Sequence, residues 1–303
     1  MRFRHHAMLH RGDHELLATA VPFIRAGLRA EGQVVAVVTR STWTALRLVL
    51  GDDGGEVEFH DAAAYYQHPV RTLAAYAALV ERHAPRPIWA VTQPPTLRAD
   101  RQGVSWARYE ALVNEAFHTV RAQVICAYDT HATEPAAVVN VRRTHPLLLH
   151  GEHASVSTAY TSPARFAAEH ERCPLPPDPR AARLAVTGED LHELRAFLTG
   201  HASRHGMNAS HVHQLVTAAC AIADNAIRHG LPPVQARLWP SAGDLVCEIA
   251  DHGHWRPGPL VGYIPPRPGE PPSGLWAARM LVDDVEIHGA FPGTRVWLRP
   301  SAD

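Results

Sequence analysis

The sequence predicts two domains of different class, an α/β domain with a mainly parallel sheet followed by an α+β domain. Its 303 residues are enough for two separate hydrophobic cores. Strand-like and helical patterns alternate through the first half, which is typical of a parallel sheet covered by helices on both faces. In the second half strands and helices occur in runs, which favours an α+β sandwich. Between the halves, RCPLPPDPR at residues 172–180 is rich in proline and predicts an extended connection.

The first half alternates short β-branched runs with amphipathic segments. The run QVVAVVT at Gln33–Thr39 is apolar almost throughout, which predicts a strand buried on both faces. Pro22 lies inside a helical pattern, so we expect a kink or a division of that helix. Strands are expected at 3–9, 33–39, 57–60, 87–92 and 123–128, and helices at 13–30, 41–50, 69–83, 104–120 and 134–144.

The second half begins after the proline-rich segment. We expect strands at 184–186, 234–239, 245–251 and 294–299, and helices at 190–206, 212–229 and 275–281. The predicted division is a first domain over 1–160, a linker over 161–182 and a second domain over 183–303.

Composition excludes several function classes. The formal net charge is −1, so no basic surface is expected for direct nucleic-acid binding. No apolar run is long enough for a membrane span, and no signal peptide is evident, which predicts a cytoplasmic protein without a membrane partner. The isolated cysteines, which have no metal-type spacing, agree with a reducing compartment.

Three histidines near the N-terminus leave two interpretations open. His6, His10 and His14 are spaced by four residues, and on one helix they could form a metal-binding face. A turn signal at residues 11–13 separates them, which favours histidines that are solvated or simply hydrogen-bonded.

Three segments of the second half together fit nucleotide chemistry. They are ADNAIRHG at 223–230, EIADHG at 248–253, and SGLWAARMLVD at 273–283 with a Gly-Thr pair at 293–294. A carboxylate at a strand end, Asp251, can accept the exocyclic amine of adenine. The side-chain oxygen of Asn225 suits Mg²⁺ that bridges phosphates. Gly274 opens a helix whose free N–H groups favour phosphate.

This second half resembles the Bergerat-type ATP-binding domain of gyrase, heat-shock chaperone ninety, histidine kinases and MutL. More narrowly, it is similar to the anti-sigma-factor serine kinases of the RsbW and SpoIIAB type. The resemblance implies ATP or ADP with Mg²⁺ as cofactor and residues 254–273 as the lid over the nucleotide. The residues that it implies for nucleotide binding are Asn225 (through Mg²⁺), His229, Asp251, Gly253, Gly274, Leu275 and Thr294.

Two positions depart from that family's pattern. Ala221 stands where the kinases have the glutamate that acts as general base, which makes phosphoryl transfer doubtful and leaves no catalytic residue to assign. His254 replaces the second glycine of the first glycine box, so the shape of the nucleotide pocket is also in question. Asp224 adjoins Asn225 but faces about 100° away on a helix, which makes it a poor substitute base.

The first half resembles the MEDS sensory family. The matching segments are FRHHAMLHRGDHELLATAVPFIRAGL, RYEALVNEAF, VICAYDT and VRRTHPLLL. The resemblance implies a RecA-like sheet without a phosphate loop, and no GxxxxGK[ST] segment occurs in the chain.

Polar residues at predicted element ends are the candidate sensing site of the first half, because ligands of parallel sheets sit where strands end. In the alternative interpretation, Glu110 and Asn114 form an ordinary helix pair and Asp129 caps a helix. The ligand-sensing candidates are Tyr109, Glu110, Tyr128 and Asp129, with Arg108, Asn114, Arg143 and His145 as further polar positions.

These features predict a cytoplasmic signalling regulator, with a homodimer as one possible state. The first domain would sense a ligand or partner, and the second would bind a sigma factor or an anti-sigma-factor antagonist. An active serine/threonine kinase that phosphorylates the antagonist is the alternative. A histidine kinase is disfavoured, because the short proline-rich linker cannot supply a dimerising hairpin with a phospho-accepting histidine.

Overall fold

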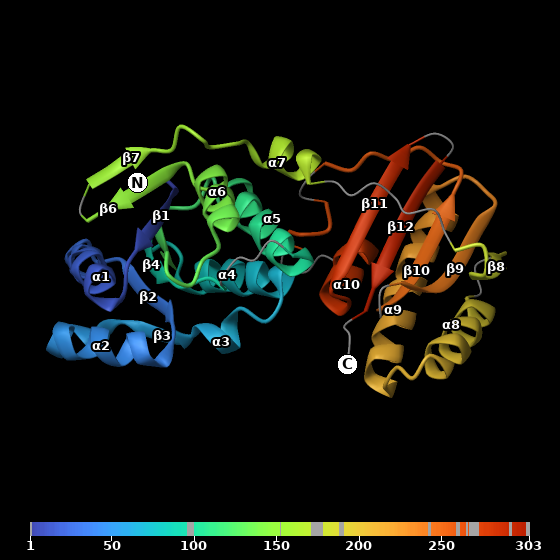
Figure 1. The fold of residues 1–303 in the computed structure, drawn as a ribbon, viewed down its shortest axis with the longest axis horizontal. Helices are drawn as coiled ribbons and strands as arrows, with labels where there is room; N and C mark the ends of the chain where they lie inside the picture. The colour runs from blue at the N-terminus through green and yellow to red at the C-terminus, as the bar shows by residue number, and fades with distance from the viewer. Residues whose placement is uncertain are drawn as a thin grey trace. The chain divides into compact units, whose positions relative to one another are not determined.

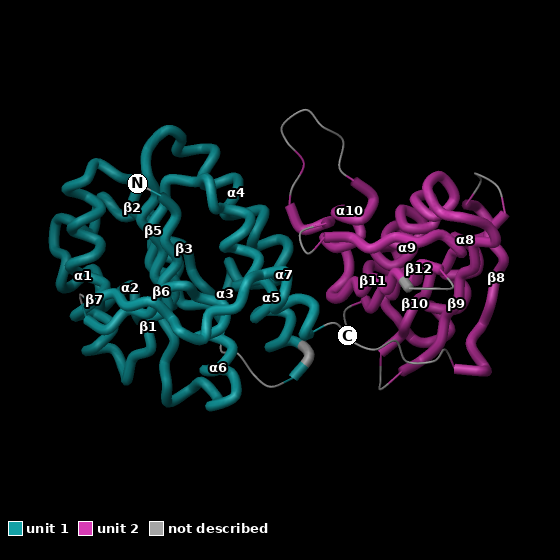
Figure 2. The backbone as a smooth tube through the Cα atoms, turned by 90° about the horizontal axis from the view of Figure 1, so that it is seen from above, with its two compact units in different colours: residues 1–170 teal, residues 171–303 magenta. Residues whose placement is uncertain are grey.

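The computed structural model describes residues 2–95, 100–151, 153–170, 178–187, 191–241, 244–258, 261–264, 266, 273–290 and 293–300. The chain divides into two compact units, residues 1–170 (unit 1) and residues 171–303 (unit 2), which Figure 2 distinguishes by colour. Each unit has its own sheet and its own core, and each is described by itself below.

Unit 1 contains a seven-stranded sheet in the order β3-β2-β4-β5-β1-β6-β7 (Figure 1). All neighbouring pairs are parallel except β6 and β7, so the predicted mainly parallel sheet is confirmed. The strands are β1 (Arg4–His10), β2 (Gln33–Val38), β3 (Glu58–Asp61), β4 (Ile88–Thr92), β5 (Ala122–Asp129), β6 (Leu147–His150) and β7 (His153–Val156).

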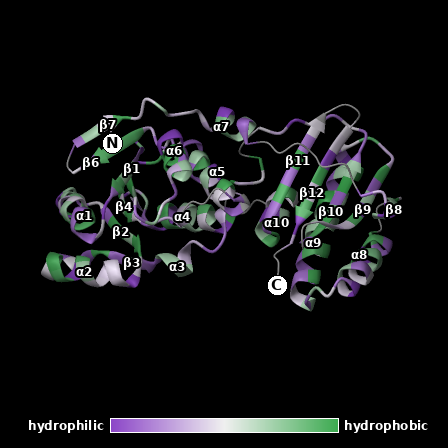
Figure 3. Cartoon of the chain, in the orientation of Figure 1, coloured by the Kyte–Doolittle hydropathy of each residue, from purple (hydrophilic) through white to green (hydrophobic). Residues whose placement is uncertain are grey.

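Helices connect the parallel strands of unit 1, as crossovers between parallel strands require. β2 is buried along its whole length, as its β-branched sequence predicts, and it is mostly hydrophobic in Figure 3. The helices are α1 (Asp13–Arg29), α2 (Arg40–Leu50), α3 (Ala62–Tyr65), α4 (Pro69–His83), α5 (Arg101–Ala116), α6 (Pro135–Thr144) and α7 (Pro163–Glu169), with a 3₁₀ segment at Gly51–Glu56.

Details of unit 1 differ from the elements expected from the sequence. Of the two outcomes expected at Pro22, a division of the helix does not occur, because α1 is one continuous helix with Pro22 inside it. Helix α7 lies within the residues predicted as the linker, its Phe166 is fully buried, and the first compact unit ends at residue 170. The sequence did not predict β7, because all four of its residues are exposed and HASV lacks a strand-like alternation. Most of the proline-rich segment, residues 171–177, lies outside the described residues.

Unit 2 contains a five-stranded antiparallel sheet in the order β11-β12-β10-β9-β8, packed against helices. The strands are β8 (Ala182–Val186), β9 (Val234–Ser241), β10 (Asp244–Asp251), β11 (Asp284–Ala290) and β12 (Gly293–Arg299). The helices are α8 (His192–Arg204), α9 (Ala209–His229) and α10 (Gly274–Leu281). This arrangement agrees with the expected α+β class.

Alternation along β10 divides the interior of unit 2. Leu245, Cys247 and Ile249 join the core that contains the apolar face of α9, whereas Val246 belongs to a smaller cluster with Trp297. Side chains on successive residues of a strand point to opposite faces, so the helices cover one face of the sheet and the smaller cluster lies on the other. Within the described residues, no helix is long and apolar enough to cross a membrane.

Candidate functional sites

The adenine end of the predicted nucleotide site lies where β10 ends. Asp251, the last residue of β10, is directly opposite Thr294 on the neighbouring strand β12. The backbone N–H groups of Gly253 and Leu231 both donate to Oδ1 of Asp251, at 2.6 and 3.4 Å. Thr294 Oγ1 donates to the carbonyl oxygen of Gly253 at 2.8 Å. Among the described residues these contacts leave Oδ2 of Asp251 without a donor, so it can accept from an adenine amine.

Glycines allow the close approach of backbone around Asp251. A Cβ on Gly253 would lie 2.8 Å from Oδ1 of Asp251, and one on Gly230 would lie 2.6 Å from the same atom. Because such distances are below any ordinary Cβ contact, a side chain at either position would displace the carboxylate. Gly230 follows the last residue of α9, which places the end of that helix beside the adenine position.

The predicted phosphate end lies where α9 packs beside the start of α10. Ser273 caps α10, with its Oγ accepting from the N–H of Trp276 at 3.2 Å. A Cβ on Gly274 would lie 3.0 Å from Nδ2 of Asn225 and 3.0 Å from the carbonyl oxygen of Ala221. The N-terminus of α10, which is the positive end of its dipole, is therefore next to the predicted Mg²⁺ ligand Asn225.

No carboxylate replaces the absent general base in the described part of this site. Ala221 is one turn before Asn225 on α9 and supplies only a methyl group. Asp224 is ion-paired with Arg228 at 2.8 Å, an i,i+4 contact on the outer surface of the helix. Its orientation agrees with the expectation that it is a poor substitute base.

The remaining predicted nucleotide residues differ in exposure. His229 and His254 are exposed, whereas Leu275 is buried in the core of unit 2. Much of the predicted lid, residues 254–273, lies outside the described residues. In its described part, Tyr263 packs over the guanidinium of Arg279 at 4.1 Å.

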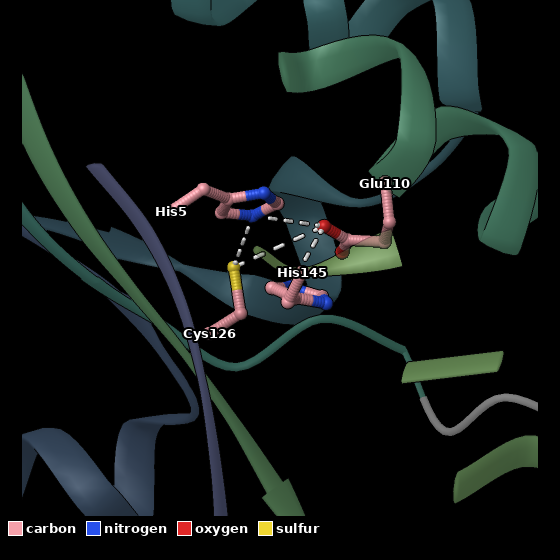
Figure 4. Close-up of side chains that lie close together, drawn as sticks. All are labelled: His5, Glu110, Cys126 and His145. Carbon is pink, nitrogen blue, oxygen red and sulfur yellow. Dashed lines mark hydrogen bonds and ion pairs between the residues drawn. The ribbon is translucent and has the colours of Figure 1, made fainter. Parts of the chain in front are cut away.

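In unit 1, four buried side chains of ligand type converge at one point (Figure 4). His5 lies on β1, Cys126 on the adjacent strand β5, Glu110 on α5, and His145 directly after α6. Oε2 of Glu110 is 3.3 Å from Nε2 of His5, 3.5 Å from Nε2 of His145 and 3.9 Å from Sγ of Cys126. Sγ of Cys126 is 3.2 Å from Nε2 of His5. We refer to His5, Glu110, Cys126 and His145 as the buried tetrad.

Burial controls the protonation of two members of the tetrad. It lowers the pKa of His145 well below its ordinary value, and the neighbouring His5 lowers it further, so His145 is neutral. Burial also raises the pKa of the Cys126 thiol, and the negative charge of Glu110 adds to that effect.

An apolar cavity of about 40 Å³ borders the tetrad at His5, Glu110 and Cys126. This volume admits only a few water-sized groups. Much of its wall is aromatic: Phe3, Tyr66, Tyr76, Tyr109 and Phe117.

The predicted sensing residues divide into two groups. Glu110 belongs to the tetrad, Tyr109 lines the cavity, and Tyr128 packs edge-on against His145 at 5.7 Å between ring centroids. Burial raises the pKa of Tyr128, and the nearby Glu110 carboxylate contributes to this shift. Asp129 is separate: its side chain is partly exposed and accepts from the N–H of His131 at 2.9 Å, as in a turn.

Two members of the tetrad, His5 and Cys126, were not predicted. They come from parallel strands, and the register that pairs Ala7 with Cys126 places both on one face of the sheet. The alternative metal site at His6, His10 and His14 is not formed among the described residues. His6 and His10 lie on β1 with His6 bonded to the carbonyl of Val124, and His14 is exposed on α1.

Of the further polar positions, Asn114 supports the tetrad directly. Its Oδ1 accepts from Nδ1 of His5 at 3.1 Å, and its Nδ2 donates to the carbonyl of Thr144 at 2.7 Å. Arg143 instead pairs with Glu169 of α7 and is not part of the tetrad.

Comparisons with known proteins identify both halves of the chain. Residues 4–146 match the model of the MEDS family, the methanogen/methylotroph DcmR sensory domain, and residues 184–299 match that of the histidine kinase-like ATPase domain. No curated protein matches the chain. A crystal structure of the RsbU and RsbW domains of a Mycobacterium tuberculosis protein is similar at 20% identity and a TM-score of 0.31. That match covers 43% of this chain and 32% of the other. The protein is therefore a MEDS domain joined to a histidine kinase-like ATPase domain.

Proposed function

We propose that this protein is a signalling regulator of the anti-sigma-factor type. The MEDS domain receives the signal, and the ATPase-type domain binds a sigma factor or an anti-sigma-factor antagonist, with ATP or ADP and Mg²⁺ in its nucleotide site. The observation that carries the proposal is the arrangement in unit 2. Asp251 and Thr294 are paired at the adenine end, and Asn225 contacts Gly274 at the phosphate end.

The absence of a base favours binding over phosphoryl transfer. Activation of a serine or threonine hydroxyl requires a proton acceptor near the γ-phosphate, and Ala221 cannot serve. Asp224 is held by Arg228 instead. A domain that binds nucleotide without transferring phosphate can still use nucleotide to stabilise the conformation that the partner recognises.

Exposed apolar side chains near the nucleotide site support a protein partner. Leu231 adjoins Asp251 through its backbone, and Trp255 follows the strand that ends at Asp251. Val261 and Ile264 lie in the described part of the predicted lid, and all four side chains are exposed. Exposed apolar side chains in segments that border a ligand site favour a role of that surface in binding a protein.

The input site of this proposal is the cavity of unit 1. It is lined by aromatic and apolar side chains, with a few polar groups supplied by His5, Glu110 and Cys126. That composition is typical of small-molecule sites. A ligand in this cavity would contact β1, β5 and α5, the elements that carry most of the tetrad.

Incubation with γ-labelled ATP and a candidate antagonist distinguishes a regulator that only binds nucleotide from an active kinase. We expect no label on the antagonist above background, because the base is absent. Label that appears with the wild-type chain and is lost in Asn225→Ala would instead establish the kinase alternative. Capture of a sigma factor or antagonist by the same full-length chain, with Mg-ATP present, is the positive expectation.

A further inference from the structure

The hydrogen bonds around the buried tetrad of unit 1 direct the Nε2 atoms of two imidazoles at one carboxylate oxygen. The Nδ2 atom of Asn114 is within 3.3 Å of three carbonyl oxygens, those of Glu110, Ala111 and Thr144. These contacts fix the orientation of its amide, so its Oδ1 must accept from Nδ1 of His5. The Nε2 atom of a neutral His5 therefore carries a lone pair.

His145 has the same tautomer for the same kind of reason. Its Nδ1 lies 2.8 Å from the carbonyl oxygen of Val141, so Nδ1 carries the hydrogen and Nε2 carries a lone pair. That lone pair faces Oε2 of Glu110 at 3.5 Å. When both imidazoles are neutral, two lone pairs and a carboxylate point at each other in the protein interior, and this arrangement is unfavourable without a cation or an extra proton between them.

The burial of Glu110 increases the free-energy cost of a carboxylate that has no permanent cation beside it. Glu110 is 1% exposed, and in the described part of the chain its ion-pair contacts are the two imidazoles. A buried carboxylate without a cationic partner is costly. A divalent cation bound by one carboxylate, one thiolate and two neutral imidazoles gives a site with no net charge, which suits a buried position.

We propose that His5, Glu110, Cys126 and His145 bind one zinc ion in the interior of the MEDS domain. This inference is independent of the nucleotide site, but it concerns three residues that border the cavity of the proposed input site, so a zinc ion there would form part of the cavity wall. Zinc suits a mixed set of imidazole, thiolate and carboxylate ligands and prefers four of them in a tetrahedron. On binding, the Cys126 thiol loses its proton to solvent and coordinates as the thiolate.

The separations within the tetrad fit that geometry. Zinc bonds of 2.0–2.3 Å in a tetrahedron imply ligand atoms roughly 3.3–3.8 Å apart. The contacts between ligand atoms are 3.2, 3.3, 3.5 and 3.9 Å, and all four atoms lie within 4.8 Å of one another. Movements of a few tenths of an ångström in most contacts would complete the site.

The partners outside the tetrad are those that zinc-binding histidines usually have. Each imidazole that binds zinc commonly donates its second N–H to a carbonyl or carboxylate, which fixes the ring and raises its basicity. His5 donates to the amide oxygen of Asn114, and His145 donates to the backbone of Val141. Asn114 is therefore a positioning residue for the metal.

Cobalt(II) titration of the full chain, after removal of bound metal with a chelator, tests the proposal. We expect visible d–d bands and a thiolate charge-transfer band that saturate at one equivalent and disappear when one equivalent of zinc is added. Cys126→Ser should lose the charge-transfer band, whereas Cys247→Ser, a change at a fully buried cysteine of unit 2, should retain it.

Two outcomes would overturn the proposal. One is a folded wild-type chain that gives no saturable cobalt spectrum. The other is a charge-transfer band that survives in Cys126→Ser. If that variant does not fold, Asn114→Ala supplies the second readout: we expect the band to persist with a zinc affinity 10- to 100-fold weaker. An unchanged zinc affinity in Asn114→Ala would count against the assigned geometry.

Discussion

Glu110 in unit 1 and Glu248 in unit 2 are both almost completely buried, and the two carboxylates have different surroundings. Glu248 in β10 accepts from Nη1 of Arg237 at 3.1 Å and from Nε1 of Trp297 at 2.8 Å. Glu110 in α5 instead faces the Nε2 atoms of two imidazoles, which carry no hydrogen when those rings are neutral, and the thiol of Cys126 at 3.9 Å. Glu248 has a guanidinium as a permanent positive partner, whereas Glu110 has none among the described residues.

Glu248 and Glu110 differ as a buried carboxylate with a structural role differs from one that can bind a metal ion. Burial alone does not distinguish them, since both side chains are at most 1% exposed. The neighbouring donors and acceptors distinguish the two carboxylates, because an N–H donor stabilises a negative charge whereas a lone pair repels it.

Removal of zinc should destabilise unit 1 and leave unit 2 unchanged. With free zinc at about 1,000 times its dissociation constant, the metal contributes about 4 kcal/mol to the free energy of unfolding. Hydrogen exchange with and without chelator would measure this loss in β1, β5 and α5. Equal loss of protection in β9, β10 and β12 would mean that the chelator acts elsewhere.

Glu248→Gln should destabilise unit 2 by about 3 kcal/mol, because it leaves the guanidinium of Arg237 without its buried counter-charge. Glu110→Gln in the zinc-free chain should cost much less, since no cation loses a partner. Denaturant unfolding of the two variants, both without metal, compares these values. A larger loss for Glu110→Gln would contradict the distinction.

Asn225→Ala should weaken Mg-ATP binding at least tenfold, equivalent to about 1.4 kcal/mol, because the phosphates lose their bridging metal ligand. Calorimetry at millimolar Mg-ATP measures the wild-type binding that we expect. Asn140→Ala, in α6 of the other unit, is the control and should bind normally. A flat trace from the folded wild-type chain would mean that the pocket does not hold nucleotide.

A third carboxylate, Glu58, tests the intermediate case of a partly exposed group with cationic partners. Burial raises its pKa, but the hydrogen bond from His60 and the charges of Arg82, His60 and His83 outweigh this effect and lower the pKa overall. A lowered pKa stabilises the fold above the ordinary value of 4.5, and this stability is lost as the pH falls. Glu58→Gln should cost about 1 kcal/mol at pH 7 and little at pH 3. A cost that is the same at both pH values would exclude this ion pairing as the cause.

The fold class could be predicted, and candidate nucleotide residues could be named, because their sequence signals are local. Asn225 and Gly274 each lie within a short characteristic segment, and the β-branched run of β2 predicts a buried strand. Glu110 and His145 were identified as polar residues at helices and element ends. His5 and Cys126 could not be found in this way, because they are 121 residues apart and meet only through the pairing of β1 with β5. Likewise, α7 was missed because its short sequence follows a region without periodicity.

The metal content of three purified full-length proteins tests the distinction between the two buried carboxylates most directly. Elemental analysis should find one zinc per chain in the wild type and in Glu248→Gln, and none in Glu110→Gln. Zinc retained by Glu110→Gln, or absent from the folded wild-type chain after zinc is supplied, would contradict it.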